Sequence, residues 1–251
     1  MTDLVPDRWL TVDGLANARD VGGLPLEGGG RVRPRVLLRT ESLEGLGEAA
    51  VAHLTGELAV AQALDLRTDH ERTTYGLGAL AEAGIPVHRL SFIPETGIAL
   101  PEVDLDDPHP MLLHYLAYLE DGRDNVVDGV RRIAGLESGA TLVHCAAGKD
   151  RTGVLVALVC SVAGVPREQI AEDYALSATR IDALFTKWTT ASGEPMPPAE
   201  EIDRHRPRAE VMAEFLRLLD ERHGGPVGWL RSHGVTDDEL ARLRARLREQ
   251  D

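Results

Sequence analysis

The sequence predicts an α/β fold in which a mostly parallel central sheet is flanked by helices on both faces. Three apolar, strand-like segments, residues 59–66, 87–92 and 141–144, are separated by segments with helical spacing, among them residues 47–56 and 125–136. Strands that alternate with helices along a chain are typical of parallel sheets, because each parallel connection must cross back over the sheet. We therefore expect the carboxyl ends of these strands to share one edge, where open α/β sheets bind their ligands.

Length and composition favour one domain, residues 1–251, that contains a helical insertion. No Pro-, Gly- or Ser-rich linker divides the chain convincingly, and its length is enough to bury a substantial core. The later part of the chain is helical: residues 166–188 predict one long helix or two, residues 191–198 (ASGEPMPP) break it, and residues 200–223 resume it. We expect residues 166–223 to form either a helical lid or an ordinary helical hairpin packed on the sheet.

The charge balance limits the kinds of partner that the protein can bind. A formal net charge of -14 argues against nonspecific nucleic-acid binding, which needs a basic face, so any anion site must be local. Two cysteines and the lack of a secretory or membrane-spanning apolar run predict a cytoplasmic protein without stable membrane insertion. Export by a route without a cleavable signal stays open, and the sequence does not indicate an oligomeric state.

The stretch TLVHCAAGKDRTGVLVALVCSVAG, residues 141–164, predicts an apolar strand, a polar loop and an apolar helix that begins near Arg151. The loop has the pattern His-Cys-x5-Arg-Thr, with Cys145 at the end of the strand. In a tight loop before a helix, successive backbone N–H groups point inward and the helix N-terminus adds partial positive charge, so an anion is the natural occupant. A thiol in that field is favoured as the thiolate. The sequence therefore predicts a phosphate-binding loop with a cysteine nucleophile.

Each residue of the loop can be given a task if the loop binds a phosphoryl group. Cys145 attacks phosphorus in line and forms a cysteinyl-phosphate, while Arg151 binds the phosphate oxygens bidentately. Thr152 donates its hydroxyl to the sulfur, and His144 orients the loop rather than acting as a base. The expected phosphate-binding residues are the rest of the loop and the start of the helix, where the glycines allow a tight backbone path: Ala146, Ala147, Gly148, Lys149 and Gly153.

The leaving group needs a proton, and the sequence offers more than one donor. Asp150, inside the loop, is the first choice, although the same position suits a carboxylate that caps the following helix. An acid from residues 102–107 is the rival, and the candidates there are Asp104, Asp106 and Asp107. Lys149 contacts either a second phosphate or a flanking acidic group, or is merely solvated.

Polar residues near the N-terminus are candidate supporting residues. Asn17, Arg19 and Asp20 precede a Gly-Gly turn, and taken alone they favour a turn in which Asn17 and Asp20 satisfy the backbone and Arg19 is solvated. Four arginines crowd residues 31–39, which predict a hairpin or consecutive short strands. These arginines, with Arg39 as the candidate site residue, either ring an anion pocket or form the solvent face of the strands.

Three further candidates, Asp65, Arg67 and Asp69, stand at the exit of the first of the three predicted strands. They belong to a site only if this strand lies beside the strand that carries the cysteine. The next residues, Thr68 and Glu71, have capping-box spacing for a short helix, which explains them adequately as structural residues. Thr236 and Glu239 repeat that spacing near the C-terminus.

The segment HCAAGKDRTG resembles the cysteine loop of protein tyrosine phosphatases, and specifically that of the atypical bacterial group of the mycobacterial tyrosine phosphatase B type. The likeness is collinear through NARDVGG, RTESL, DLRTDHER and the C-terminal GWLRSHGVTDDELARLRARL, so it covers nearly the whole chain. Two positions depart from the group: Ala146 stands where some relatives have an aromatic residue, and Thr40 replaces a serine. These departures concern substrate preference rather than the reaction.

The resemblance implies a Cys-dependent phosphatase fold and a metal-independent phosphomonoesterase that needs no cofactor. Its implied substrates are proteins that carry phosphotyrosine, with phosphoserine, phosphothreonine or phosphoinositides also possible substrates, and inorganic phosphate is both product and ligand. The group is thought to use the loop aspartate, here Asp150, in place of the acid on a Trp-Pro-Asp loop, which this sequence lacks. A paired helical lid is also a feature of the group.

Two other functions remain as alternatives. A rhodanese-type sulfurtransferase also places a cysteine in an anion-binding loop, but His144 and the Arg151-Thr152 pair disfavour it. A noncatalytic phospho-binding module is disfavoured because the nucleophile, the arginine and the hydroxyl are all present.

Overall fold

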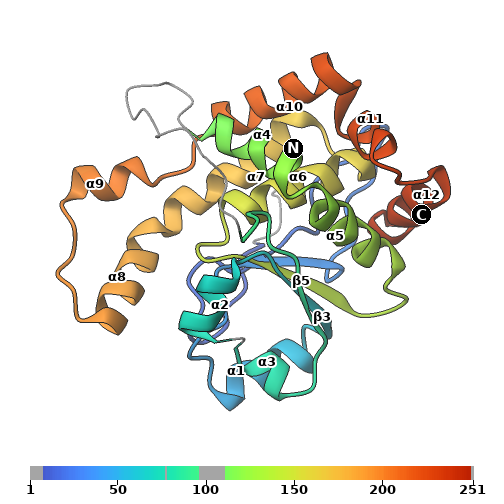
Figure 1. Cartoon of the computed structure of the whole chain (residues 1–251). Helices are drawn as coiled ribbons and strands as arrows, with labels where there is room; N and C mark the ends of the chain where they lie inside the picture. Colours follow the sequence, from blue (N-terminus) through green and yellow to red (C-terminus); the bar gives the residue numbers. More distant parts are fainter. Residues whose placement is uncertain (1–7, 77, 96–110, 250–251) are drawn as a thin grey trace, which may run out of the picture.

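A computed structural model describes residues 8–76, 78–95 and 111–249 of the chain (Figure 1). Within these residues, five strands form one sheet in the order β1-β2-β5-β3-β4. The sheet is parallel apart from its first strand, which pairs antiparallel with the second. The predicted α/β fold with a mostly parallel sheet is therefore confirmed. The strands are β1 (Arg19–Asp20), β2 (Leu37–Thr40), β3 (Val60–Asp65), β4 (Val87–Arg89) and β5 (Ala140–His144).

Helices cover both faces of the sheet, as predicted. They are α1 (Glu48–Thr55), α2 (Asp69–Tyr75), α3 (Ala79–Glu82), α4 (Leu112–Asp121), α5 (Arg123–Gly135), α6 (Asp150–Ala163), α7 (Arg167–Ala175), α8 (Ile181–Ser192), α9 (Ala199–Arg204), α10 (Ala209–His223), α11 (Gly225–Ser232) and α12 (Asp237–Leu247), with a 3-10 turn, η1 (Leu176–Arg180), between α7 and α8.

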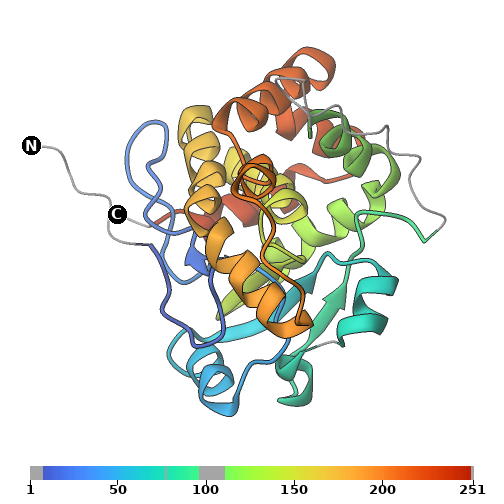
Figure 2. The ribbon, with the colours of Figure 1, turned by 90° about the vertical axis from the view of Figure 1, so that its left-hand side faces the viewer.

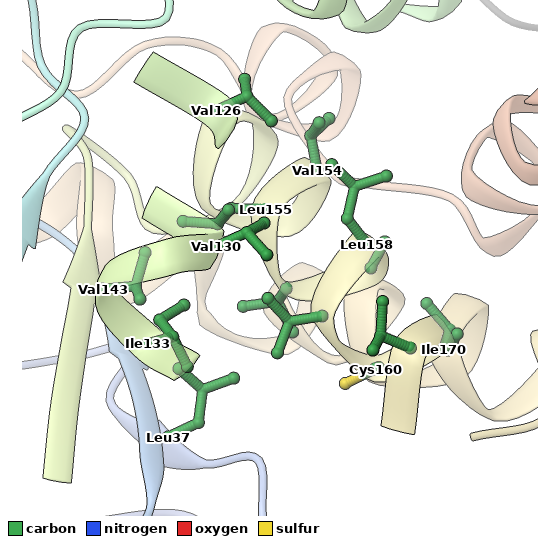
Figure 3. Close-up of a cluster of buried hydrophobic side chains, with 14 of the residues drawn as sticks. Leu37, Val126, Val130, Ile133, Val143, Val154, Leu155, Leu158, Cys160 and Ile170 are labelled. Carbon is green, nitrogen blue, oxygen red and sulfur yellow. The ribbon is translucent and has the colours of Figure 1, made fainter. Parts of the chain in front are cut away.

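The alternation of side chains along the strands divides the core into two parts. Leu37 of β2 and Val143 of β5 face the larger part, which they share with α4 to α7 and α10 to α12 (Figure 3). Their neighbours Leu38 and Leu142 face the smaller part, beneath α1 and α3. Helix α6 is buried on nearly all sides, as expected for a helix that is apolar around its circumference. The loop between β5 and α6 thus connects a fully buried strand to a largely buried helix.

Some boundaries differ from those predicted. The Asn-x-Arg-Asp cluster contributes a short strand, β1, and residues 31 and 32 make isolated bridges rather than a regular strand. The predicted helix over residues 200–223 is two helices, because Pro207 lies between α9 and α10 and a proline lacks the N–H that a helix interior requires.

Helices α8 and α9 lie on one side of the fold, at the front in Figure 2. Phe185 and Leu184 of α8 pack with Ile202 of α9, and the partly buried Ala147 of the cysteine loop packs against this cluster. The helical segment 166–223 therefore reaches the loop, but its action as a lid stays a prediction. Within the described ranges, no helix is both long and apolar enough to cross a membrane.

Candidate active site

The cysteine loop lies at the carboxyl edge of the central strand. Cys145 follows β5 directly, β2 and β3 flank this strand, and Cys145 is only 2% exposed. The helix after the loop begins at Asp150, one residue before the predicted start. Gly148 has a φ of +69°, and a Cβ there would lie 2.4 Å from the carbonyl carbon of Thr40. A side chain at this position would push the loop away from β2.

The loop turns its carbonyl groups outward. Because the C=O and N–H of a trans peptide point in opposite directions, an outward carbonyl places the next N–H on the inner side of the loop. Three inward N–H groups beside a helix N-terminus form an anion-binding nest. Three consecutive carbonyls accept hydrogen bonds from outside the loop: that of Ala146 from Ser42 N (3.1 Å), that of Ala147 from Asn17 Nδ2 (2.9 Å) and that of Gly148 from Arg39 Nη2 (2.9 Å).

Arg151 is held at the site by a carboxylate from another helix. Its two terminal nitrogens donate to the two carboxylate oxygens of Glu71, at 2.6 and 2.8 Å. Glu71 also closes the capping box of α2 with Thr68, so the first turn of α2 fixes the acceptor. Burial alone would raise the pKa of Glu71, but the Arg151 guanidinium outweighs burial and lowers it. The side chain of Arg151 is thus oriented before any substrate binds.

Asp150 accepts a hydrogen bond from one member of a buried pair of tyrosines. Tyr115 of α4 donates its hydroxyl to Asp150 Oδ1 at 2.6 Å, and the Tyr174 hydroxyl of α7 lies 2.5 Å from that of Tyr115. Burial, with Asp150 nearby, raises the pKa of both tyrosines well above its usual value, so both stay protonated. Lys149 Nζ lies 3.5 Å from Asp150 Oδ2 and donates to the carbonyl of His205 at 2.7 Å.

A buried carboxylate, Asp173 of α7, gathers three arginines. Arg8 and Arg39 contact its two oxygens at 2.7 Å each, and Arg19 lies at 3.3 Å. These arginines outweigh burial and hold the pKa of Asp173 well below its usual range. Burial and the charge of Arg39 lower the pKa of Arg19 to about 9. Arg39 joins this cluster to the loop, because it also binds the carbonyl of Gly148.

Similarity to known proteins agrees with this geometry. The pattern of the tyrosine phosphatase family matches residues 10–249 of the chain. The chain belongs to the tyrosine phosphatase family. This confirms the family predicted from the sequence. The site is therefore that of a Cys-dependent phosphatase, and the sulfurtransferase alternative is not favoured.

Individual relatives are similar over most of their length. A tyrosine-protein phosphatase of Nostoc commune is 30% identical over 216 residues, which cover 84% of this chain and 73% of the relative. The triple specificity protein phosphatase PtpB of Mycobacterium tuberculosis is 28% identical over 257 residues, covering 85% of this chain and 91% of the relative. A putative tyrosine-protein phosphatase of Cupriavidus necator is 28% identical over 245 residues, which cover 94% of this chain and 86% of the relative.

The phosphatase brings Asp65 and Arg67 close to the cysteine loop, because β3 lies beside β5 and Asp65 is in register with His144. Arg67 donates to both carboxylate oxygens of Asp65, at 2.8 and 2.9 Å, and forms an ion pair with Glu44. Burial raises and Arg67 lowers the pKa of Asp65, with a net decrease. The two residues thus form a closed ion pair beneath the loop rather than open ligands.

His144 and Thr152 are buried in the phosphatase without a hydrogen-bond partner among the described residues. Neither ring nitrogen of His144 has one, so the expected orienting hydrogen bonds of this residue are not formed in this structure. Burial lowers the pKa of His144, which favours the neutral ring. The hydroxyl of Thr152 is likewise unpaired and remains available for the proposed bond to a thiolate.

The structure also places the N-terminal residues that the sequence marked as supporting candidates. Asn17 and Asp20 do satisfy backbone groups, since Asp20 accepts from the N–H groups of Gly22 and Arg35. The prediction that Arg19 is solvated was wrong, because its side chain is fully buried against Asp173. Arg39 does border the loop. Asp104, Asp106 and Asp107, the rival acids, lie outside the described residues.

Several residues of the site were not predicted. Glu41 accepts hydrogen bonds from the N–H groups of Ala16 and Asn17, and Lys187 of α8 lies 3.3 Å from it. It is fully buried, although nothing in its local sequence distinguishes it from a surface glutamate. A partial signal existed for Glu71, whose capping position was recognised. No signal in the sequence marked Asp173, Tyr115 or Tyr174, because their partners are far away in the sequence.

Proposed function

We propose that this phosphatase hydrolyses phosphate monoesters, phosphotyrosine in proteins first among them, with Cys145 as its nucleophile. The observation that carries the proposal is the inward-facing nest, which has Cys145 at the start of the loop and the Glu71-bound Arg151 at the start of the helix. A nest of N–H groups and a fixed guanidinium stabilise the charge that spreads over the phosphoryl oxygens in the transition state.

The proposed reaction has two displacements. The thiolate of Cys145 attacks phosphorus, the ester P–O bond breaks, and the leaving oxygen takes a proton from Asp150. A water molecule then attacks the cysteinyl-phosphate and gives its proton to Asp150, and the P–S bond breaks to release inorganic phosphate. The free hydroxyl of Thr152 stabilises the sulfur as the leaving group of this second step.

The substrate range of the proposal follows the relatives. One of them is named a triple specificity protein phosphatase, which supports phosphoserine and phosphothreonine as further substrates and leaves room for phosphoinositides. We place the enzyme in the cytoplasm as a single domain, residues 1–251. The contact of Ala147 with the α8–α9 cluster supports residues 166–223 as its lid.

The proposal predicts that Cys145→Ser abolishes hydrolysis of p-nitrophenyl phosphate, by about four orders of magnitude or more, because a serine hydroxyl is not ionised in this field. Binding of inorganic phosphate or vanadate should persist, since the N–H groups and Arg151 remain. Rate measurements and calorimetric titration with phosphate check both results.

Cys160→Ser is the matched control. Cys160 lies in the buried part of α6, and burial raises the pKa of its thiol, so it stays protonated and should not contribute to turnover. Retention of turnover by Cys145→Ser, or its loss in Cys160→Ser with the fold intact, contradicts the assignment.

A further inference from the structure

A hollow that shares no residue with the catalytic loop lies where α4, α10 and α11 meet (Figure 1). Its volume is about 420 Å³, within the range of about 300–1,000 Å³ that small-molecule sites occupy. None of the loop residues 145–151 lines it. A molecule bound in this hollow therefore leaves the cysteine loop open.

The floor of the hollow is apolar. Leu116 and Leu119 of α4 line it with Leu219 of α10 and Trp229 of α11, and all but Leu116 are buried. The ring of His233 is stacked on that of Trp229, with the two centroids 4.3 Å apart, and the carbonyl of Trp229 accepts from Nδ1 of His233 at 2.7 Å. This pair of rings is thus held in place before any ligand binds.

The rim of the hollow is cationic. Arg222 and His223 end α10 and Arg123 begins α5, and all three are exposed. Arg123 lies 3.6 Å from Asp124, whereas Arg222 makes no ion pair within the described ranges. Glu120 adds one carboxylate to the lining. Two guanidinium groups and one carboxylate leave the lining net positive, although the chain has a formal net charge of -14.

This arrangement matches an organic anion that has a flat apolar body. The leucines and the stacked rings can cover such a body and remove it from water. A guanidinium group binds a carboxylate through two parallel hydrogen bonds. A small inorganic anion would use only the rim, and an uncharged apolar molecule would use only the floor. A carboxylate joined to an aromatic ring uses both.

We propose that this hollow is a binding site for aryl carboxylates, in which the ring lies on the leucine floor and Arg222 binds the carboxylate. Glu120 repels the bound carboxylate and limits its affinity. Arg222 and Glu120 therefore have opposite effects on binding. The site is separate from the cysteine loop, so its occupation does not depend on the proposed function.

The test measures the Kd of 2-naphthoate by isothermal titration calorimetry, with the full-length protein saturated with vanadate. Vanadate fills the catalytic loop, where an aryl carboxylate could otherwise bind in place of a phosphorylated substrate. Naphthalenemethanol has the ring without the charge, and acetate has the charge without the ring. The variants are Arg222→Gln and Glu120→Gln, with Arg242→Gln as the matched control, because Arg242 is exposed on α12 and does not line the hollow.

We expect 2-naphthoate to bind saturably in the presence of vanadate. Binding should be about three- to ten-fold weaker in Arg222→Gln, from the loss of one charged hydrogen-bond partner. Glu120→Gln should bind about two- to three-fold more tightly, because it removes a like charge. Arg242→Gln should match the wild type. Naphthalenemethanol and acetate should each bind at least about tenfold more weakly than 2-naphthoate.

Other outcomes overturn the proposal. Loss of binding when vanadate is present places the anion on the catalytic loop. Equal weakening in Arg222→Gln and Arg242→Gln assigns the effect to overall charge, and weaker binding in Glu120→Gln contradicts the placement of the carboxylate. If acetate binds as well as 2-naphthoate, the apolar floor takes no part. Absence of saturable binding to the wild type at millimolar concentrations removes the site, and leaves the proposed function to the hydrolysis test of Cys145→Ser.

Discussion

At the scale of single residues, Asp150 has the most demanding task, since it must give a proton in one step and take one in the next. Its partner Tyr115 stays protonated, because burial and the nearby carboxylate raise the pKa of the phenol well above its usual value. The hydroxyl of Tyr115 therefore acts as a permanent donor to Asp150 Oδ1. It fixes one oxygen of the carboxyl group and thereby orients the other.

We predict that Tyr115→Phe slows hydrolysis of aryl phosphates about five- to ten-fold, the worth of one hydrogen bond. The loss should grow as the leaving group becomes poorer, because only a poor leaving group depends on the proton from Asp150. In an Asp150→Asn background, Tyr115→Phe should not slow hydrolysis any further. A series of substituted phenyl phosphates, measured with the two single variants and the double variant, checks this.

Tyr174→Phe provides the control, since it removes a hydroxyl from the same buried pair but leaves the bond from Tyr115 to Asp150. Tyr174→Phe should slow the hydrolysis of aryl phosphates less than Tyr115→Phe does. Two results would contradict this role: Tyr115→Phe slows hydrolysis equally for substrates with good and with poor leaving groups, or it slows hydrolysis by the same factor in the Asp150→Asn background. In either case Tyr115 supports the fold and does not position the acid.

At the scale of elements, the first turn of α2 serves the active site as well as its own helix. Glu71 accepts from the N–H of Thr68 as the third residue of a capping box, and its carboxylate holds both terminal nitrogens of Arg151. Helix α2 follows β3, the neighbour of β5, so the sheet topology brings a helix start and the cysteine loop together. A local sequence motif can reveal the cap but not its second partner.

Glu71→Gln should lower kcat for p-nitrophenyl phosphate about tenfold or more while phosphate inhibition does not weaken. Glutamine keeps the capping geometry, so the helix start survives. It removes the charge that orients Arg151, which costs transition-state stabilisation, but it leaves a guanidinium that still attracts phosphate. Steady-state rates and the inhibition constant of inorganic phosphate measure the two effects.

Glu239→Gln is a matched control for that substitution. Glu239 is the third residue of the capping box of α12 and pairs with Arg131. Helix α12 contacts the C-terminal end of α6, where Arg244 donates to the carbonyl of Val162, and not the loop before α6. Glu71→Gln should lose more thermal stability than Glu239→Gln, because Arg151 is more buried than Arg131, and only Glu71→Gln should lose activity. An unchanged kcat in Glu71→Gln contradicts a role for this ion pair in catalysis.

The helices and strands show which features of the fold a local sequence pattern can predict. The strand, loop and helix around Cys145 were predictable because apolar period, turn residues and the cysteine motif all lie within 24 consecutive residues, 141–164. The break between α9 and α10 was missed, although Pro207 marks it, because the apolar spacing continues on both sides of the proline. Solvation of Arg19 was predicted wrongly for another reason: an arginine is normally exposed unless a partner, here distant in sequence, pairs with it.

At the scale of the whole molecule, Asp173 joins parts of the chain that no local pattern connects. Its carboxylate binds an arginine of the N-terminal segment, one of β1 and one of β2, and Arg39 of β2 in turn holds the carbonyl of Gly148. The antiparallel edge of the sheet, α7 and the catalytic loop are therefore coupled through one buried charge. Such a cluster exists only after these elements have packed, so the sequence alone cannot reveal it.

We predict that Asp173→Asn lowers the free energy of unfolding by about 3–5 kcal/mol at pH 7, because it leaves buried guanidinium groups without their counter-charge. Since the folded pKa of Asp173 lies below the unfolded value, its contribution is fully present above about pH 4 and is lost as the pH falls through the folded pKa. The difference in free energy of unfolding between the wild type and Asp173→Asn should thus stay constant near neutrality and shrink in strong acid. Urea unfolding at pH 7, 5 and 3 measures this difference, with Asp128→Asn as the control. Asp128 is a partly exposed partner of Arg132, and its replacement is expected to lose at most about 0.5 kcal/mol. If the two variants lose equal stability, or if the difference grows in acid, then the Asp173 cluster does not stabilise the fold through its charge.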